Sequence, residues 1–347
     1  MGENDKPVIS QAENVSEKPR KRGCVGHCVK FWWAYLILLI VVIVVVVPVL
    51  ILVAVPKIAQ SKLDHAELIL EGISVSNTQS NVMTMSINSV IKSSGGVSAN
   101  IEPFEGVMYL EDRLPHTPFA KINFPATTAA KLQTVNVTQE LEIHDIDALT
   151  TFNQWLLANE TLRVTVEGET RIRVKGIARN YPVTFKKTIE MPGLNHLDGT
   201  IVNNTDIFLS PDENGNNFVG DTYIPNRSLV SFELGNVTFF NYLLGDEVGE
   251  VFIDNLVVVA GAPNKNRMRA TIQNDPVLHA LGEKPYCDET NGVLPFQIRG
   301  KSVKNHGEEL EYFTNALNKY NQTIPIDIGG TLKKSVGITI PCGGLPH

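Results

Sequence analysis

Hydrophobic residues run without a break from Phe31 to Val55, and no charged residue interrupts them. A helix needs about 20 apolar residues to cross a hydrocarbon core of about 30 Å. In lipid the backbone polar groups must be paired within the segment, which a single helix achieves and a lone strand does not. The pattern therefore predicts a transmembrane helix over residues 31–55. Pro48 lies toward its far end, where membrane helices tolerate the distortion that proline causes.

Basic residues flank this run unequally. Because cytosolic flanks carry the excess of Lys and Arg, the N-terminus is predicted to be cytosolic. We expect residues 1–30 to form a disordered cytosolic tail, 56–65 a juxtamembrane linker, and the remainder to lie in a lumen or outside the cell. Cleavage as a signal peptide is the competing interpretation, although signal peptides have an apolar region of only about 7–15 residues. The basic residues before the run are Lys18, Arg20, Lys21, Arg22 and Lys30, and those after it are Lys57 and Lys62.

Alternation with a period of two dominates the rest of the chain and is typical of half-buried strands. Between Leu162 and Val174 apolar side chains occupy most even positions and charged ones many odd positions. Such a segment buries one face in an antiparallel sheet. Asn214-Gly215, inside a polar segment, predicts a hairpin turn. Further strands are predicted over residues 66–75, 83–91, 135–143, 183–189, 229–240, 251–259 and 267–272.

Two segments have helical periodicity instead. In residues 145–158 the hydrophobic side chains recur on one face, and Asp145 is available as the N-cap. In residues 307–320 the same spacing recurs, and Glu308 and Glu309 suit the positive end of a helix dipole. Both segments predict short helices among the strands.

The order of helix, Asn-x-Thr sequence and strand occurs twice, about 160 residues apart, and indicates an internal duplication. Pro192-Gly193 is the predicted junction. We therefore expect a mainly β protein, in which the N-terminal transmembrane helix precedes two tandem antiparallel β-sandwich domains, each with one short helix. The predicted domains cover residues 66–192 and 193–344.

Charge excludes one class of partner. The formal net charge is −7 at pH 7, and the first 30 residues contain six basic and four acidic side chains, so the remainder carries −9. Because binding to a phosphate backbone depends on basic side chains, an acidic ectodomain is not expected to bind nucleic acid.

The four cysteines divide along the predicted membrane. Cys24 and Cys28 are expected on the reducing side, close to the span, where S-palmitoylation is one interpretation. Free thiols and, more weakly, a metal site with His27 are the other interpretations. Cys287 and Cys342 are the only ectodomain cysteines, and an oxidising compartment favours a disulfide between them.

Glycosylation acceptor sequences follow the predicted span, and one more, at Asn14, lies in the tail. If the topology is as predicted, those beyond the span are exposed to glycosylation and Asn14 is not. The predicted acceptors are Asn136, Asn159, Asn203, Asn226, Asn236 and Asn321.

No catalytic signature follows the span. The chain has no G-x-S-x-G motif and no H-E-x-x-H motif, and its histidines are scattered. Glu167 and Glu169 share a strand face and could in principle serve a glycosidase, although such pairs are usually solvated surface. Residues 212–223 begin like a calcium loop, but Asn217 and Tyr223 stand where that loop needs Gly and Glu, so a turn is expected. We expect no enzyme activity, no cofactor and no metal.

A family resemblance is carried by the segment from Ile224 to Phe239, IPNRSLVSFELGNVTF, together with the anchor and the strand-rich ectodomain. The chain resembles fungal single-pass membrane proteins whose domain has no assigned function and whose pattern is related to late-embryogenesis-abundant type 2 sandwiches. In the family motif the order before the strand is usually Asn-Pro-Ser, and residues 225–228 of this chain, Pro-Asn-Arg-Ser, depart from it. The resemblance implies tandem β-sandwiches facing the vacuolar lumen or the cell exterior, with the vacuolar membrane favoured. It implies no established reaction and supplies no catalytic residues.

Two binding functions and one enzymatic function are thus distinguished. The favoured one is a luminal or extracellular module that binds a protein partner or gives structural support through its sheets. The second is a sandwich that holds a lipid near the membrane, and the third is a hydrolase. The candidate lipid lining is Val237, Phe239, Phe240, Tyr242, Leu243 and Leu244.

Overall fold

The computed structural model describes residues 32–93, 99–128 and 130–343. The predicted tail, with Cys24, Cys28 and Asn14, lies outside the described residues. The chain divides into two compact units, and the division falls between Val55 and Pro56.

From Trp32 onward the apolar run is helical, as predicted. Helix α2 (Trp32–Val49), the π-helical turn η1 (Leu50–Ala54) and α3 (Val55–Asp64) follow one another directly. The π-helical turn lies between Pro48 and Pro56, and Pro56 has no N–H to donate to the carbonyl of Leu52 within that turn. The resulting 33-residue helix is long and apolar enough to cross a membrane, by length and composition, and a signal sequence has the same properties.

The segment predicted as a linker, 56–65, is helical through Asp64. Ala59 and Leu63 are buried. The Gln60 side chain donates to Thr184 O at 2.9 Å and accepts from Thr184 N at 3.0 Å. Because Gln60 satisfies both backbone groups of Thr184, this helical turn extends the hydrogen bonding of strand β9 (Asn180–Pro192).

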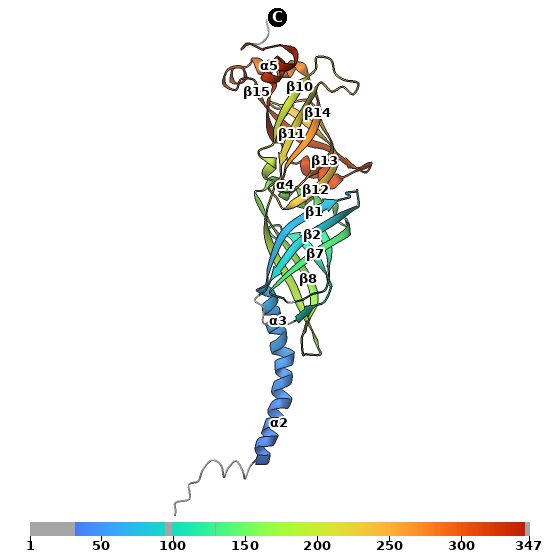
Figure 1. The fold of residues 1–347 in the computed structure, drawn as a ribbon, viewed down its shortest axis with the longest axis vertical. Coiled ribbons are helices and arrows are strands. Elements are labelled where there is room, and N and C mark those ends of the chain that lie inside the picture. The colour runs from blue at the N-terminus through green and yellow to red at the C-terminus, as the bar shows by residue number, and fades with distance from the viewer. Residues whose placement is uncertain (1–31, 94–98, 129, 344–347) are drawn as a thin grey trace, which may run out of the picture. The chain divides into compact units, whose positions relative to one another are not determined.

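The described part of the second unit is mainly β, as predicted, and its strands form two sheets (Figure 1). The larger has eleven strands, eight of them in the order β10-β11-β14-β13-β12-β1-β2-β7, with β15, β16 and β17 joined beside β12. Its strands are β1 (Glu67–Ser76), β2 (Val82–Lys92), β7 (Leu132–Glu142), β10 (Ile201–Ile207), β11 (Phe218–Pro225), β12 (Val230–Leu243), β13 (Asp246–Val258), β14 (Pro263–Ile272), β15 (Val293–Asn305), β16 (Glu308–Glu309) and β17 (Gln322–Asp327).

The smaller sheet has six strands in the order β5-β4-β8-β3-β6, with β9 on the other side of β8. Leu162, Val164 and Val166 of β8 are buried, and the alternation that predicted this strand is confirmed. The remaining strands are β3 (Ala99–Ile101), β4 (Phe104–Leu110), β5 (Ala120–Phe124), β6 (Thr127–Thr128) and β8 (Thr161–Val174).

The predicted helix over 145–158 is confirmed as α4 (Ile146–Ala158). The Asp145 carboxylate accepts from Ala148 N at 2.8 Å, which satisfies one of the free N–H groups of the first turn. The helix predicted over 307–320 is shorter, because α6 covers only Glu311–Leu317. Both His306 and Gly307 have positive φ, so the chain turns there and Glu308 pairs back onto β15 instead of starting a helix.

The larger sheet crosses the predicted junction at residues 192 and 193. Strand β1 runs parallel to β12, with Ile73 opposite Val230 and Val75 opposite Phe232. This is a departure from the antiparallel pairing that we expected throughout. The division into domains 66–192 and 193–344 stays a prediction.

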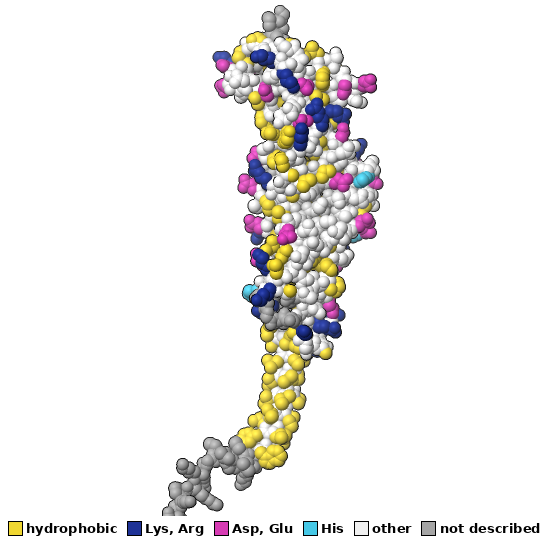
Figure 2. All heavy atoms as spheres, in the orientation of Figure 1, with side chains coloured by type: hydrophobic (Ala, Val, Ile, Leu, Met, Phe, Trp, Pro, Cys, Tyr) yellow, Lys and Arg dark blue, Asp and Glu magenta, His cyan; other side chains and the backbone are white. Residues whose placement is uncertain are grey.

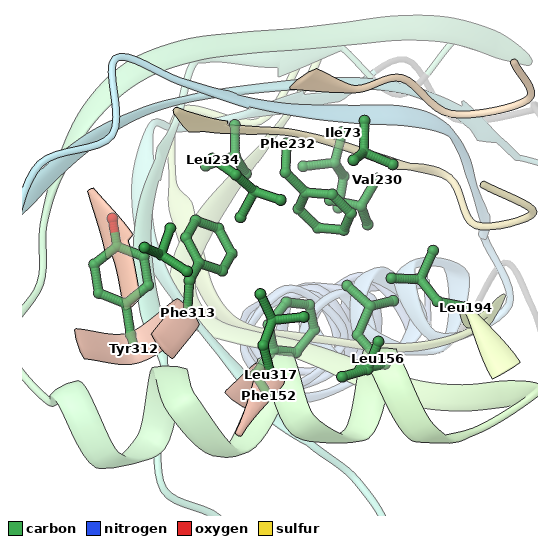
Figure 3. Packing of buried hydrophobic residues seen from close by; sticks show 14 of the residues in the cluster. Ile73, Phe152, Leu156, Leu194, Val230, Phe232, Leu234, Tyr312, Phe313 and Leu317 are labelled. Atoms are coloured by element: carbon green, nitrogen blue, oxygen red, sulfur yellow. The ribbon is translucent and has the colours of Figure 1, made fainter. Parts of the chain in front are cut away.

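Part of the hydrophobic core lies where helices α4 and α6 face strands β1 and β12 of the larger sheet (Figure 3). Leu156 of α4 and Phe313 of α6 point toward Phe232 of β12 in this view. The rings of Phe232 and Phe313 meet edge to face, with centroids 6.2 Å apart. The two predicted helices thus pack into one shared core.

Candidate interaction surface

The strands β11, β14, β13, β12 and β15 place alternating basic and aromatic side chains on one face. Side chains directly opposite each other in antiparallel strands point to the same side of a sheet. The register puts Tyr223 opposite Lys265, Phe252 opposite Arg269, and Phe240 opposite Arg299. We call this set, with Tyr242 and Lys301, the cation–aromatic face.

Each ring of the cation–aromatic face has a cation over it. The Lys265 ammonium lies 5.7 Å from the Tyr223 ring centroid, and the Arg269 guanidinium lies 6.0 Å from that of Phe252. Separations of this size give an attraction of about 0.5–1 kcal/mol at exposed sites. The distances at the other end of the face are 5.9 Å from Arg299 to Phe240, 5.3 Å from Arg299 to Tyr242 and 5.2 Å from Lys301 to Phe240.

Arg299 differs from the other cations of this face. It donates to the Tyr242 hydroxyl at 2.8 Å, and its Nε is buried without a hydrogen-bond partner. Within the described ranges no carboxylate pairs with it, whereas Lys265, Arg269 and Lys301 each contact one. Arg299 is therefore a cation of this face whose charge no carboxylate of the described residues neutralises.

Acidic side chains on the same face neutralise part of its charge. Asp221 contacts Lys265 at 3.0 Å and Arg267 at 3.3 Å, Asp254 contacts Arg269 at 2.6 Å, and Glu250 contacts Lys301. These three carboxylates contact four cations, and a fourth carboxylate, Glu247, lies opposite Tyr242, so acidic and basic side chains nearly balance on this face. Figure 2 shows Lys and Arg side chains gathered beside hydrophobic ones over the region where Figure 1 labels β13 and β14.

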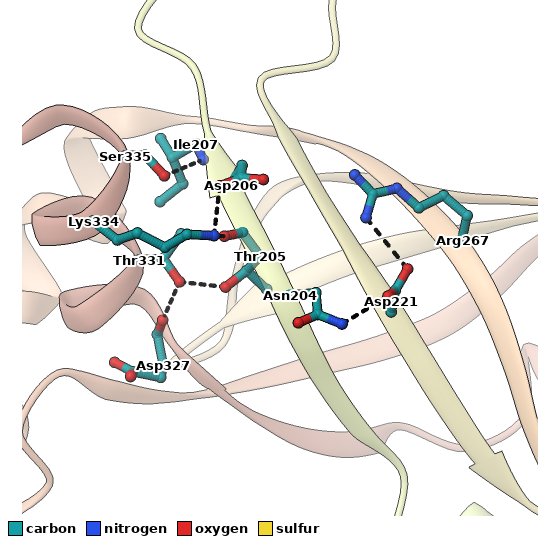
Figure 4. A network of polar contacts seen from close by, with 10 residues as sticks. All are labelled: Asn204, Thr205, Asp206, Ile207, Asp221, Arg267, Asp327, Thr331, Lys334 and Ser335. Carbon is teal, nitrogen blue, oxygen red and sulfur yellow. Dashed lines mark hydrogen bonds and ion pairs between the residues drawn. The ribbon is translucent and has the colours of Figure 1, made fainter.

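Asp221 is the most strongly held carboxylate at this face (Figure 4). Asn204 donates to it at 2.9 Å, and this bond, followed by those from Lys265 and Arg267, lowers the pKa of Asp221 to about 2. Asp221 is therefore ionised at any physiological pH. Its charge fixes two cations that would otherwise repel each other.

The outer edge of β10 is covered by helix α7 (Ile328–Val336) (Figure 4). Ser335 Oγ accepts from Ile207 N at 3.2 Å, and the Thr205 and Thr331 hydroxyls share a hydrogen bond. Lys334 Nζ donates to Thr205 O at 3.0 Å. These contacts engage backbone N–H and C=O groups of the edge strand β10. Fewer of these groups are therefore free to pair with an added strand.

In the candidate glycosidase pair, Glu167 does not have the electrostatics of a general acid. Glu167 accepts from the Tyr109 hydroxyl at 2.7 Å and contacts Lys186 at 3.1 Å. The Tyr109 bond first, and Lys186 second, lower the pKa of Glu167 below its usual range. A general acid at neutral pH needs a raised pKa. Glu169 lies on the same strand face and accepts from the Thr184 hydroxyl at 3.4 Å.

The candidate lipid lining is divided between two faces of β12. Val237, Phe239 and Leu243 are buried, whereas Phe240 and Tyr242 belong to the cation–aromatic face. Leu244 is 49% exposed at the hairpin tip. Because successive residues of a strand point to opposite sides, this run cannot line one cavity.

The predicted disulfide between Cys287 and Cys342 is present, with the Cα atoms 5.3 Å apart. It joins the π-helical turn η3 (Pro285–Glu289), which follows helix α5 (Asn274–Gly282), to the end of the described chain. Gly343 N donates to Gly282 O at 2.9 Å beside it.

The predicted glycosylation acceptors differ in burial. Asn226 is only 3% exposed and is engaged in hydrogen bonds, so we no longer expect a glycan there. Asn159 is half-buried, and its Nδ2 donates to Trp155 O at 2.8 Å. The exposed acceptors are Asn136, Asn203, Asn236 and Asn321.

The first part of the calcium-like segment is a turn, as predicted, and its residues 218–223 belong to strand β11. Asp212 Oδ1 accepts from Asn214 N and Asn216 N, both at 2.8 Å, and Gly215 has a φ of 83°. The carboxylate is thus occupied by its own loop. Across residues 32–93, 99–128 and 130–343, no group of three or more His, Cys, Asp or Glu side chains is placed to hold a metal ion.

The cation–aromatic face was not recognised from the sequence, although part of its pattern was visible. Arg267 and Arg269 alternate with Met268 and Ala270 in a segment that was predicted as a strand. Strand β15, which supplies Arg299 and Lys301, was missed. Pro295 and Gly300 interrupt its period-two pattern, and both residues are unfavourable in strand interiors.

Comparisons with known proteins give distant likenesses. No curated protein matches the chain. A disulfide-, isopeptide- and ester-cross-linked adhesin from the bacterium Mobiluncus mulieris is 9% identical, over 77% of this chain and 94% of its own, with a TM-score of 0.18. The transglutaminase of red sea bream is 10% identical, over 74% of this chain and 31% of its own, with a TM-score of 0.21. Residues 117–241, a range that extends across the predicted junction, match the model of a family described as a protein of unknown function, DUF3712.

Proposed function

We propose that this protein is a single-pass membrane-anchored, non-enzymatic module that binds a protein partner outside the cytosol through the cation–aromatic face. The observation that carries the proposal is Arg299, whose guanidinium lies over the Phe240 and Tyr242 rings and has no carboxylate partner among the described residues. Aromatic and Arg side chains are enriched in the parts of interfaces that contribute most to binding.

The contacts of Arg299 with Phe240 and Tyr242 favour binding because they order the Arg299 side chain before a partner arrives. Immobilising a flexible side chain on association costs about 0.5–1.5 kcal/mol. Arg299 is already held by two rings and by the Tyr242 hydroxyl. A partner carboxylate could then accept from its guanidinium with little further ordering.

The remaining expectations on location belong to this proposal. The N-terminus is cytosolic, the β-rich unit is luminal or extracellular at a fungal-type membrane, and the vacuolar membrane is favoured over the plasma membrane. Late-embryogenesis-abundant-like sandwiches and palmitoylation of Cys24 and Cys28 are further parts of it. The unequal basic flanks support this orientation.

Membrane fractionation tests the anchor. The full-length protein is expected to stay with the membranes after extraction at alkaline pH, and its β-rich unit is expected to resist protease added to the cytosolic face of sealed vesicles. Release into the supernatant would show a cleaved signal sequence instead, and digestion of the large unit would reverse the orientation.

In-cell photo-crosslinking tests the surface. A photoreactive side chain at Val219, opposite Arg269 on the cation–aromatic face, is expected to give a discrete protein adduct in cells expressing the full-length protein. Arg299→Ala should abolish the adduct, and Arg299→Lys should weaken it because an ammonium lacks the planar fork. A photoreactive side chain at Glu169, on the other sheet, is the control. Equal adducts from both positions would contradict the proposal.

Neither alternative is favoured by a specific contact. The two core cavities described below, of about 40 and 60 Å³, are far smaller than the engineered cavity of about 150 Å³ that holds benzene, and a larger hollow of about 810 Å³ is lined in part by Asn100, Arg173 and Lys175. Lipids detected by mass spectrometry in the purified protein would revive lipid binding. Activity in a hydrolase panel that Glu167→Gln removes would revive the enzyme hypothesis.

A further inference from the structure

Two small cavities adjoin inside the core between the strands and the two helices. One has a volume of about 40 Å³ and the other about 60 Å³. Leu197, Ile224 and Phe239 line both of them. Figure 3 shows several residues of the larger cavity, among them Leu156, Phe232 and Leu317.

The smaller cavity, unlike the larger, has two amide side chains in its wall with unused hydrogen-bonding atoms. Asn241 and Gln322 are each 3% exposed, and Asn241 Oδ1 and Gln322 Nε2 are buried without a partner. Asn241 lies opposite Ile298, and Ile298 lies opposite Gln322, on adjacent strands β12, β15 and β17. The register therefore puts both amides in one row on the same face of the sheet.

The larger cavity differs in its chemistry. Its lining is apolar apart from Asn153, and the Asn153 amide already donates to Tyr312 O at 3.4 Å. Buried apolar cavities of this kind stay empty of water. The two cavities thus share walls and differ mainly in whether unused amide groups face them.

We propose that the smaller cavity is a binding site for ordered water that bridges Asn241 and Gln322. A buried polar group without a hydrogen-bond partner is strongly unfavourable, and a bridging molecule satisfies both amides at once. A water needs roughly 10–15 Å³ of such volume, so about 40 Å³ holds one or more. The site offers an acceptor at Asn241 and a donor at Gln322, which suits a molecule that both donates and accepts.

Crystals of the full-length protein under xenon pressure test the assignment. We expect water density within hydrogen-bond distance of both amides in the smaller cavity, and xenon only in the larger, apolar cavity. Xenon bound between Asn241 and Gln322, or amides turned toward protein groups with no density between them, would overturn the proposal. A larger polar molecule in that density would identify a different ligand and overturn the water assignment.

Substitutions give a second test in the full-length protein in detergent. Asn241→Leu and Gln322→Met each remove one partner of the water, so each should lower the melting temperature by several degrees. The double variant removes the whole polar site, so its melting temperature should fall by clearly less than the two single shifts combined. Met268→Leu, which changes the same lining without a polar group, is the control. Strictly additive shifts in melting temperature would show that the two amides are independent and share no water. That outcome would overturn the proposal.

Discussion

The hydroxyl of Ser228 donates to Asn226 Oδ1 at 2.7 Å, and both side chains are buried. Asn226 Nδ2 in turn donates to Val230 O at 2.8 Å and to Val258 O at 3.3 Å. The acceptor sequence Asn226-Arg227-Ser228 thus builds the turn that enters β12. The Asn226 side-chain nitrogen, to which a glycan would be attached, is therefore engaged in hydrogen bonds within the fold.

We therefore predict no glycan on Asn226 in the folded protein. Asn226→Gln is expected to lower the free energy of unfolding by about 2–3 kcal/mol, because buried partners lose their hydrogen bonds. Chemical denaturation and glycopeptide mapping measure the two effects. Asn136→Gln, at an exposed strand position, is the control and should change stability by less than about 0.5 kcal/mol. Full occupancy at Asn226 would refute the first expectation.

Acid should weaken the region around Asp221. Its pKa is lowered to about 2 in the folded state, against about 3.9 in an unfolded chain. A carboxyl whose pKa is lowered by folding contributes stability above its unfolded pKa and loses it as the pH falls through its folded pKa. The loss is therefore expected between about pH 4 and pH 2.

Asp221→Asn checks this assignment. The variant keeps the shape of the side chain but cannot titrate, so its melting temperature should depend less steeply on pH across that window than the parent's. Melting curves recorded at several pH values measure it. Parallel pH profiles for both proteins would mean that other carboxyls dominate acid unfolding.

Gly249 is expected to reject any side chain. Its φ is 149°, and a Cβ there would lie 1.8 Å from Thr271 O, a backbone atom that cannot move cheaply. Gly249→Ala should cost at least about 3 kcal/mol, since strain and a clash combine. Gly245→Ala is the matched comparison, with a φ of 103° and nothing within 4 Å, and should cost only about 1 kcal/mol. Similar unfolding free energies for both variants would contradict the steric argument.

The disulfide should stabilise the end of the chain. Cys287 and Cys342 are 55 positions apart, and in the loop-entropy model closing a loop of this size contributes about 4 kcal/mol. The double substitution Cys287→Ser with Cys342→Ser should lower the free energy of unfolding by up to that amount. Denaturation of the parent with and without reductant gives the control. An unchanged midpoint in reductant would mean that the C-terminal segment adds nothing to the core.

Local patterns in the sequence predicted much of the fold. The alternation in residues 162–174 depends only on neighbours in the chain, and β8 follows it. Asp145 caps α4 because the cap and its target are three residues apart. The helix over 307–320 was overestimated because a positive φ at His306 and Gly307 turned the chain, and helical spacing alone does not reveal that turn.

The sequence by itself determined the apolar helix, the mainly β class and the disulfide, because each depends on composition or on short-range periodicity. Only the tertiary structure decided that β1 runs parallel to β12, that Asn226 is buried, and that Arg299 lies over Phe240 and Tyr242. These features depend on register between strands that are far apart in the chain. Register is set by how whole faces pack, and a shift of one residue would move every side chain to the other face.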